Sequence, residues 1–224
     1  MEYHVFMKYS SILFDLDGTL TDSYPGIKNS IKYSLQKFDI SEEDDEKLKA
    51  FVGAPLEKSF MKYYGFDKGT ARKAVEHYRE YFQEKGMYEN RLYDGTEELL
   101  RALNGKNAVC IIATSKSVIF ARKILEHFRI NVHFRHIAGS GPDGASVEKE
   151  GVIRLVIEKY GLNRRKTIMI GDRKYDISGA NKNGIDSIAV LYGYGSREEL
   201  EKASPKYLCG SVTDISKILT KRAP

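Results

Sequence analysis

The chain has 224 residues, of which 42% are hydrophobic, enough for one α/β domain with an inserted subdomain or for two small domains with an ordinary apolar core. Its 36 basic and 31 acidic residues are interspersed and leave a formal charge of +5, which predicts no nucleic-acid or membrane partner and mildly favours anionic small molecules. The two cysteines, Cys110 and Cys209, have no metal-ligand spacing, so we expect buried reduced thiols.

The N-terminal segment, residues 1–10, mixes charged and aromatic residues and has no apolar stretch of the kind found in secretory signals. We therefore expect neither a signal peptide nor a membrane span, and a cytoplasmic location.

The first predicted element is a short apolar strand, residues 12–14, that ends at Asp15. Asp17 and Gly18 follow, and the carboxyl end of a strand is where open α/β sheets keep their chemistry. Two ionised carboxylates about 4 Å apart repel by roughly 4 kcal/mol at an effective dielectric constant of about 20, so we expect a metal ion as the compensating charge. Taken alone, the stretch would also fit a strand followed by a solvated turn.

The next segment is predicted to be all helical. Ile27, Ile31, Leu35 and Phe38 recur at intervals of three and four residues, as one face of a helix does. Further helices are expected over 42–51, 56–64 and 68–85, with no convincing strand between them. We therefore expect residues 24–90 to form an inserted helical domain, and residues 1–23 and 91–224 to form the core.

From residue 94 onward, strands and helices alternate, which predicts a parallel sheet built from βαβ units. Strands are expected over 108–113, 134–139, 167–170, 187–191 and 207–209. Helices are expected over 97–103, 118–128, 149–160, 174–183, 196–203 and 215–219. The predicted fold class is α/β, with a Rossmann-like parallel sheet and an inserted all-helical cap.

Polar clusters follow several of these strands. They are residues 15–19, Thr114 with Ser115 and Lys116, Lys149, and residues 171–176. The carboxyl ends of parallel strands meet at one edge of a sheet, so we expect these clusters to converge. Each also has an ordinary interpretation: Thr114 and Ser115 could cap the next helix, Lys149 could be solvated, and Asp172 and Asp176 could complement a helix N-terminus.

The order of the clusters resembles the haloacid dehalogenase-like phosphatase superfamily. Its four motifs match residues 15–20, Thr114, Lys149 and residues 171–176, and its helical cap follows the first motif. The resemblance extends over about residues 11–219, and DLDGTLTDS combined with GDxxxD is its most specific part. Three further sequence segments resemble the phosphoglycolate phosphatase-like branch of this superfamily and, within it, the 5'-nucleotidase-like group. They are residues 51–56, 89–95 and 194–200.

The resemblance implies a Mg²⁺-dependent phosphatase. Its substrate would be a small phosphate monoester, of the phosphoglycolate or nucleoside 5'-monophosphate type, hydrolysed through an aspartyl-phosphate on Asp15. Asp17 would be the general acid and base, and Thr114 and Lys149 would complete the catalytic set.

The resemblance also implies the binding residues. Gly18, Thr114, Ser115 and Lys149 would bind the phosphate group. The metal ligands would be the Asp15 and Asp172 carboxylates and the Asp17 backbone carbonyl. Asp176 would not bind the metal itself but would orient metal-bound water or Lys149.

Some alternatives stay open. A sugar phosphomutase would keep the same motifs, and a receiver-like phosphoacceptor would form a long-lived phosphate on Asp15 without turnover. Lys116 competes with Lys149 for the position beside Asp15, although the order of the family motifs favours Lys149. We expect a monomer or a weak homodimer.

Overall fold

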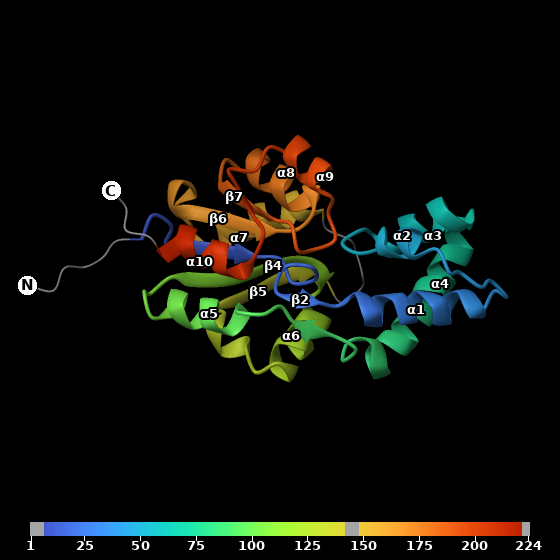
Figure 1. Cartoon of the computed structure of the whole chain (residues 1–224). Coiled ribbons are helices and arrows are strands. Elements are labelled where there is room, and N and C mark those ends of the chain that lie inside the picture. Colours follow the sequence, from blue (N-terminus) through green and yellow to red (C-terminus); the bar gives the residue numbers. More distant parts are fainter. Residues whose placement is uncertain (1–6, 142–147, 221–224) are drawn as a thin grey trace, which may run out of the picture. The chain divides into compact units, whose positions relative to one another are not determined.

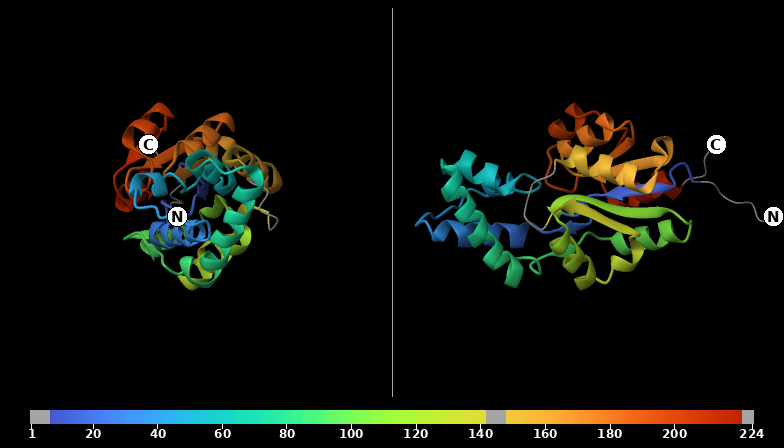
Figure 2. Two further views of the ribbon diagram at one scale, coloured as in Figure 1. Left: turned by 90° about the vertical axis from the view of Figure 1, so that its right-hand side faces the viewer. Right: turned by 180° about the vertical axis from the view of Figure 1, so that it is seen from behind.

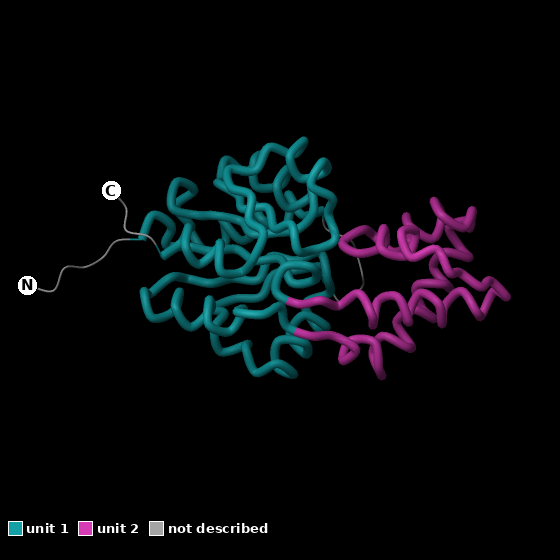
Figure 3. The backbone as a smooth tube through the Cα atoms, in the orientation of Figure 1, with its two compact units in different colours: residues 1–20, 92–224 teal, residues 21–91 magenta. Residues whose placement is uncertain are grey.

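The computed structural model describes residues 7–141 and 148–220 (Figure 1). The first six residues of the segment for which we expect no signal peptide lie outside these ranges. Within them, no helix is both long enough and apolar enough to cross a bilayer. The chain divides into two compact units (Figure 3): the α/β unit, residues 1–20 and 92–224, and the helical unit, residues 21–91.

The α/β unit contains a six-stranded sheet in the order β5-β4-β1-β6-β7-β8, and every neighbouring pair is parallel. The strands are β1 (Ser11–Phe14), β4 (Val109–Ser117), β5 (His136–Ser140), β6 (Thr167–Gly171), β7 (Asp186–Val190) and β8 (Tyr207–Cys209). The predicted parallel α/β fold is therefore confirmed. Strand β1 lies between β4 and β6, so the residue that follows it emerges near the middle of the sheet.

Helices cover both faces of this sheet (Figures 1 and 2). Helices α7 and α8 pack together on one face, with α9 beside α8, whereas α5 and α10 pack together and α6 lies against β4 and β5. Their bounds are α5 (Thr96–Asn104), α6 (Val118–His127), α7 (Lys149–Tyr160), α8 (Lys174–Lys182), α9 (Arg197–Lys202) and α10 (Val212–Thr220). Short 3₁₀ turns occupy Asn131–His133 and Arg164–Lys166.

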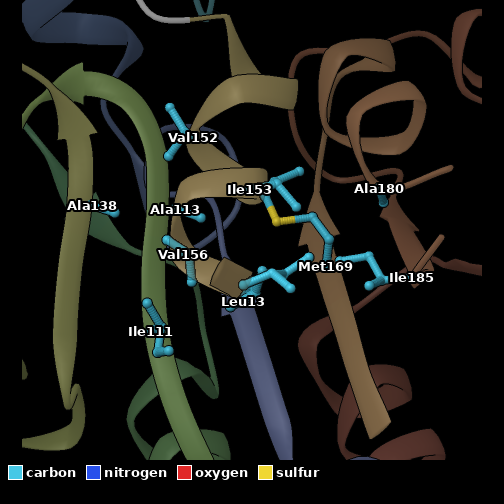
Figure 4. Packing of buried hydrophobic residues seen from close by; sticks show 11 residues of the cluster. Leu13, Ile111, Ala113, Ala138, Val152, Ile153, Val156, Met169, Ala180 and Ile185 are labelled. Carbon is cyan, nitrogen blue, oxygen red and sulfur yellow. The ribbon is translucent and has the colours of Figure 1, made fainter. Parts of the chain in front are cut away.

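The core beneath α7 consists of apolar side chains, mostly from β1, β4, β6 and the inner face of the helix, together with Ala138 of β5, Ala180 of α8 and Ile185 (Figure 4). Leu13 and Met169 of the sheet and Ile153 and Val156 of α7 are fully buried. Strands covered on both faces need apolar residues on both sides, which explains the uninterrupted apolar run of β1. Burial of each such side chain contributes about 1.5–3 kcal/mol. Cys110 and Cys209 are buried free thiols, as expected.

The helical unit contains four α-helices: α1 (Tyr24–Gln36), α2 (Asp45–Lys49), α3 (Leu56–Tyr64) and α4 (Lys68–Tyr81). A π-helical turn, Phe82–Gly86, continues α4, and two short strands, β2 (Thr21–Asp22) and β3 (Arg91–Leu92), form a separate two-stranded sheet. Phe51 and Phe60 lie inside the unit with ring centroids 5.1 Å apart and edge-to-face geometry. This aromatic pair gives the unit a core of its own.

Several predicted elements have other bounds in the structure. The helix expected over 42–51 is shorter, because the Asp44 carboxylate accepts hydrogen bonds from the amides of Glu46 and Lys47 and starts α2 at residue 45. The strand expected over 108–113 continues to Ser117, with an irregular register against β5 after Ala113. The last helix begins three residues earlier, at Val212.

Candidate active site

The register of the sheet brings the predicted motifs together. Phe14 of β1 pairs with Ile112 of β4 on one side and with Ile170 of β6 on the other. The next residue, Asp15, donates its backbone N–H to the Ile170 carbonyl at 2.9 Å. The motifs after β1 and β6 and the motif at the end of β4 therefore lie at the same edge of the sheet.

Lys149 connects two of the buried aspartates. Its Nζ lies 2.8 Å from Oδ1 of Asp15 and 2.8 Å from Oδ1 of Asp176, and it donates to the Ala113 carbonyl at 3.0 Å. The lysine is 5% exposed, so the solvated interpretation of Lys149 is wrong. Burial by itself lowers the pKa of Lys149, but the attraction of Asp15 and Asp176 outweighs it and raises the pKa above its ordinary value. The ammonium group therefore stays charged.

Asp172 is the third buried carboxylate, and it has no ion-pair partner among the described residues. Its Oδ2 accepts the backbone N–H of Tyr194 at 2.8 Å, and its Oδ1 accepts the Thr19 hydroxyl at 3.3 Å. Burial, together with the charges of Asp176 and Asp15, raises the pKa of Asp172 well above its ordinary value. Burial likewise raises the pKa of Asp176 to about 6, although Lys149 acts in the opposite direction.

The carboxylates of Asp15, Asp172 and Asp176 form a group that could hold a metal ion. One oxygen from each lies within 4.8 Å of the others. Lys149 supplies one positive charge to three carboxylates, and the one that it does not contact is the fully buried Asp172. An oxygen-only donor set with excess negative charge suits a hard divalent cation.

Asp172 is enclosed by three glycines. A Cβ atom on Gly18 would lie 2.2 Å from Oδ2 of Asp172, one on Gly193 would lie 2.3 Å from its Cβ, and one on Gly195 would lie 2.1 Å from its carbonyl oxygen. Gly18 also has a positive φ of 78°. Neither Gly193 nor Gly195 was predicted as a site residue, although their Gly-x-Gly spacing, which begins two residues after the predicted strand 187–191, was the available signal.

Asp17 interacts with the second lysine of the site. Oδ2 of Asp17 lies 2.8 Å from Nζ of Lys116, and both side chains are largely buried. Oδ1 of Asp17 is buried and has no hydrogen-bond partner among the described residues. Lys149 and Lys116 were both candidates for the position beside Asp15. Both lie in the site, Lys149 beside Asp15 and Lys116 beside Asp17.

Thr114 and Ser115 lie in the irregular end of β4. Oγ1 of Thr114 accepts the backbone N–H of Lys116 at 3.2 Å, and the Ser115 carbonyl accepts the Ser140 hydroxyl at 2.7 Å. Helix α6 starts only at Val118, so neither residue caps it and the capping interpretation is wrong. The segment is instead held by β5 at the same sheet edge as Asp15.

A model of the family described as haloacid dehalogenase-like hydrolase matches residues 12–190. The chain belongs to this family. The resemblance predicted from the four motifs is thereby confirmed, and so is the enzyme class, a hydrolase.

Two of the similar proteins match this haloacid dehalogenase-like hydrolase over nearly its whole length. The 5'-nucleotidase of Pseudomonas aeruginosa is 45% identical over 213 residues, 95% of this chain and 96% of that protein. The crystal structure of a predicted phosphatase from Clostridium acetobutylicum is 51% identical with a TM-score of 0.89, covering 93% of this chain and 97% of that one. Tyrosine-protein kinase PtkA of Mycobacterium tuberculosis is 33% identical over 202 residues, 90% of this chain and 69% of PtkA.

Proposed function

We propose that this haloacid dehalogenase-like phosphatase hydrolyses nucleoside 5'-monophosphates through a phosphoryl group carried on Asp15. The observation that supports it most strongly is the buried group of Asp15, Asp172 and Asp176 around Lys149 at the carboxyl edge of the sheet. The 45% identity to a 5'-nucleotidase over 95% of the chain favours a nucleotide over phosphoglycolate.

Asp15 is the nucleophile. Its carboxylate attacks phosphorus, the bond from phosphorus to the ester oxygen breaks, and the alcohol leaves. Lys149, with Nζ 2.8 Å from the Asp15 carboxylate, keeps that side chain oriented and compensates part of the charge gathered at the site.

Asp17 transfers the protons. In the first half-reaction its carboxyl group gives a proton to the departing alcohol oxygen, and in the second it takes a proton from the water that attacks the phosphoaspartate. The second step breaks the bond between Asp15 and phosphorus, releases phosphate and restores both aspartates. Oδ1 of Asp17, which has no partner in the described structure, is the oxygen available for this exchange.

The phosphate group is bound by the ends of β1 and β4. The Thr114 hydroxyl and the Ser115 amide donate to the phosphoryl oxygens, where negative charge is spread in the transition state. Gly18 lets the backbone approach the same group without a side chain.

Mg²⁺ is the proposed cofactor, held by the carboxylates of Asp15 and Asp172 and by the backbone carbonyl of Asp17, with Asp176 supporting Lys149. When bound there, it neutralises charge on the phosphate group and on the carboxylates. The donor set fits this ion, because the fully buried Asp172 carboxylate has no ion-pair partner among residues 7–141 and 148–220.

We assign residues 1–23 and 91–224 to the catalytic core and residues 24–90 to a cap that selects the leaving alcohol. The partner is a small phosphate ester, with no role for nucleic acid or membrane. A cytoplasmic monomer or weak homodimer remains our prediction.

The test is phosphate release from a panel of esters, with and without Mg²⁺: nucleoside 5'-monophosphates, phosphoglycolate, sugar phosphates and pyrophosphate. We expect Mg²⁺-dependent release with a preference for nucleoside 5'-monophosphates. Asp15→Asn should abolish turnover and leave folding and Mg²⁺-dependent ligand binding largely intact, whereas Asp94→Asn, at an exposed position of the same unit, should have no effect.

Other outcomes would replace the proposal. Interconversion of sugar phosphates without phosphate release would identify a phosphomutase. A phosphorylated protein that does not turn over would identify a receiver-like phosphoacceptor. Turnover by Asp15→Asn near the wild-type rate would refute the nucleophile.

A further inference from the structure

The end of β4, which carries the proposed phosphate-binding residues Thr114 and Ser115, also brings a lysine to the proposed proton-transferring carboxylate. Nζ of Lys116 lies 2.8 Å from Oδ2 of Asp17, and the two side chains are only 9% and 12% exposed. A lysine–carboxylate pair this buried is geometrically restrained, unlike an exposed ion pair.

The backbone at this end of β4 is held by β5 and by Thr114. Gly139 of β5 approaches so closely that a Cβ there would lie 2.3 Å from the Lys116 carbonyl oxygen. The Ser140 hydroxyl holds the Ser115 carbonyl at 2.7 Å, and Oγ1 of Thr114 accepts the Lys116 amide at 3.2 Å. These contacts fix the backbone of Lys116, and with it the starting position of its side chain.

The two oxygens of Asp17 consequently have different surroundings. Oδ2 is held by the Lys116 ammonium, whereas the buried Oδ1 has no hydrogen-bond partner in the described part of the chain. A carboxyl group that must reach a departing oxygen within hydrogen-bond distance works best when its orientation is set in advance.

We propose that Lys116 is a positioning residue for Asp17: it holds Oδ2 so that Oδ1 faces the ester oxygen and delivers the proton when the alcohol leaves. This inference rests on the proposed phosphatase function. It assigns the two lysines separate tasks, Lys149 at the nucleophile and Lys116 at the proton donor.

The test measures kcat/KM of wild type and Lys116→Met for two substrates. This constant reports the steps up to departure of the alcohol. A nucleoside 5'-monophosphate releases an alkoxide that needs a proton, whereas p-nitrophenyl phosphate releases a stable phenolate. We expect kcat/KM to fall roughly 10- to 100-fold for the nucleotide and less than about threefold for p-nitrophenyl phosphate.

Three further variants complete the test. Lys116→Arg should recover part of the nucleotide activity, because it restores a cation and a donor. Lys116→Met added to Asp17→Asn should cause no further loss for the nucleotide, because the lysine acts through that carboxylate. Lys123→Met, an exposed lysine on α6, is the matched control and should behave as wild type. Thermal unfolding of each variant shows whether it is folded.

Equal losses on both substrates, no loss on either, or an additive effect in the double variant would overturn the assignment of Lys116. If Lys116→Met does not fold, kcat/KM of Lys116→Arg is compared with that of the wild type. Because arginine positions Asp17 imperfectly, the variant should lose more kcat/KM for the nucleotide than for p-nitrophenyl phosphate, and equal losses for both substrates would contradict the proposal. A wild-type protein that releases phosphate from no ester would instead refute the proposed function.

Discussion

Gly193 lies against Asp172 so closely that a Cβ atom on the glycine would come within 2.3 Å of the aspartate Cβ and 2.4 Å of the Gly18 carbonyl oxygen. The loop after β7 therefore packs directly on the buried carboxylate that follows β6. A shift of Gly193 would therefore disturb the Asp172 side chain and the backbone of Gly18.

Gly193→Ala is the first prediction. The added methyl group displaces either the loop or Asp172, so we expect a loss of about 1–3 kcal/mol in the free energy of unfolding. Mg²⁺ affinity, measured by titration calorimetry, should fall as well. Gly210→Ala, whose nearest neighbour would be 3.8 Å away, is the control and should change neither quantity. A Gly193→Ala protein with normal stability and metal affinity would show that the loop adapts freely.

The second prediction concerns Lys149→Met. This change leaves Asp15 and Asp176 buried without their shared cation, a situation that typically costs about 3–5 kcal/mol. We expect a lower melting temperature and loss of phosphatase activity, with Mg²⁺ recovering part of the stability but not the activity. Lys182→Met removes an exposed ion pair with Glu150 and should stay within about 0.5 kcal/mol of wild type. Similar melting temperatures for the two variants would contradict the role of Lys149.

The third prediction is a pH dependence of the stabilisation by Mg²⁺. Burial raises the pKa of Asp176 to about 6 and the pKa of Asp172 well above its ordinary value. In the metal-free protein, the stability contributed by these carboxyl groups is present below their unfolded pKa, about 4, and is lost as the pH rises through the folded values. At the proposed site, Mg²⁺ would bind the ionised Asp172 carboxylate and displace its proton, and its charge would also favour the ionised form of Asp176 nearby.

The increase in melting temperature caused by saturating Mg²⁺ should therefore be larger at pH 7.5 than at pH 5, and calorimetry across this range measures it. Asp172→Asn should abolish most of the difference. An equal increase at both pH values in the wild-type protein would show that the ion binds elsewhere.

The fourth prediction concerns the helical unit. Phe60 is fully buried against Phe51, so Phe60→Ala should cost about 3–5 kcal/mol. Hydrogen exchange should show the loss of protection in residues 21–91, with β1 and β6 unchanged, because the α/β unit has its own core. Met61→Ala, at the neighbouring and exposed position, is the control. A uniform loss over both units would indicate that they unfold together.

The sequence alone determined the fold class and the positions of the motifs. Apolar runs ending in Asp15 and Asp172, alternating with helical stripes, are local patterns, and parallel strands necessarily bring their carboxyl ends to one edge. The spacing of residues within a motif is also a local property, so the sequence predicts the site residues without the distances between their side chains.

Only the tertiary structure decided which side chains meet. Lys149 contacts Asp15 while Lys116 contacts Asp17, and this choice depends on the register of β1 with β4 and on the close approach of Gly139 in β5. Gly193 acquires its importance in the same way, from packing against Asp172 on a neighbouring strand end. Such contacts join residues distant along the chain, so their energies depend on packing that no local pattern specifies.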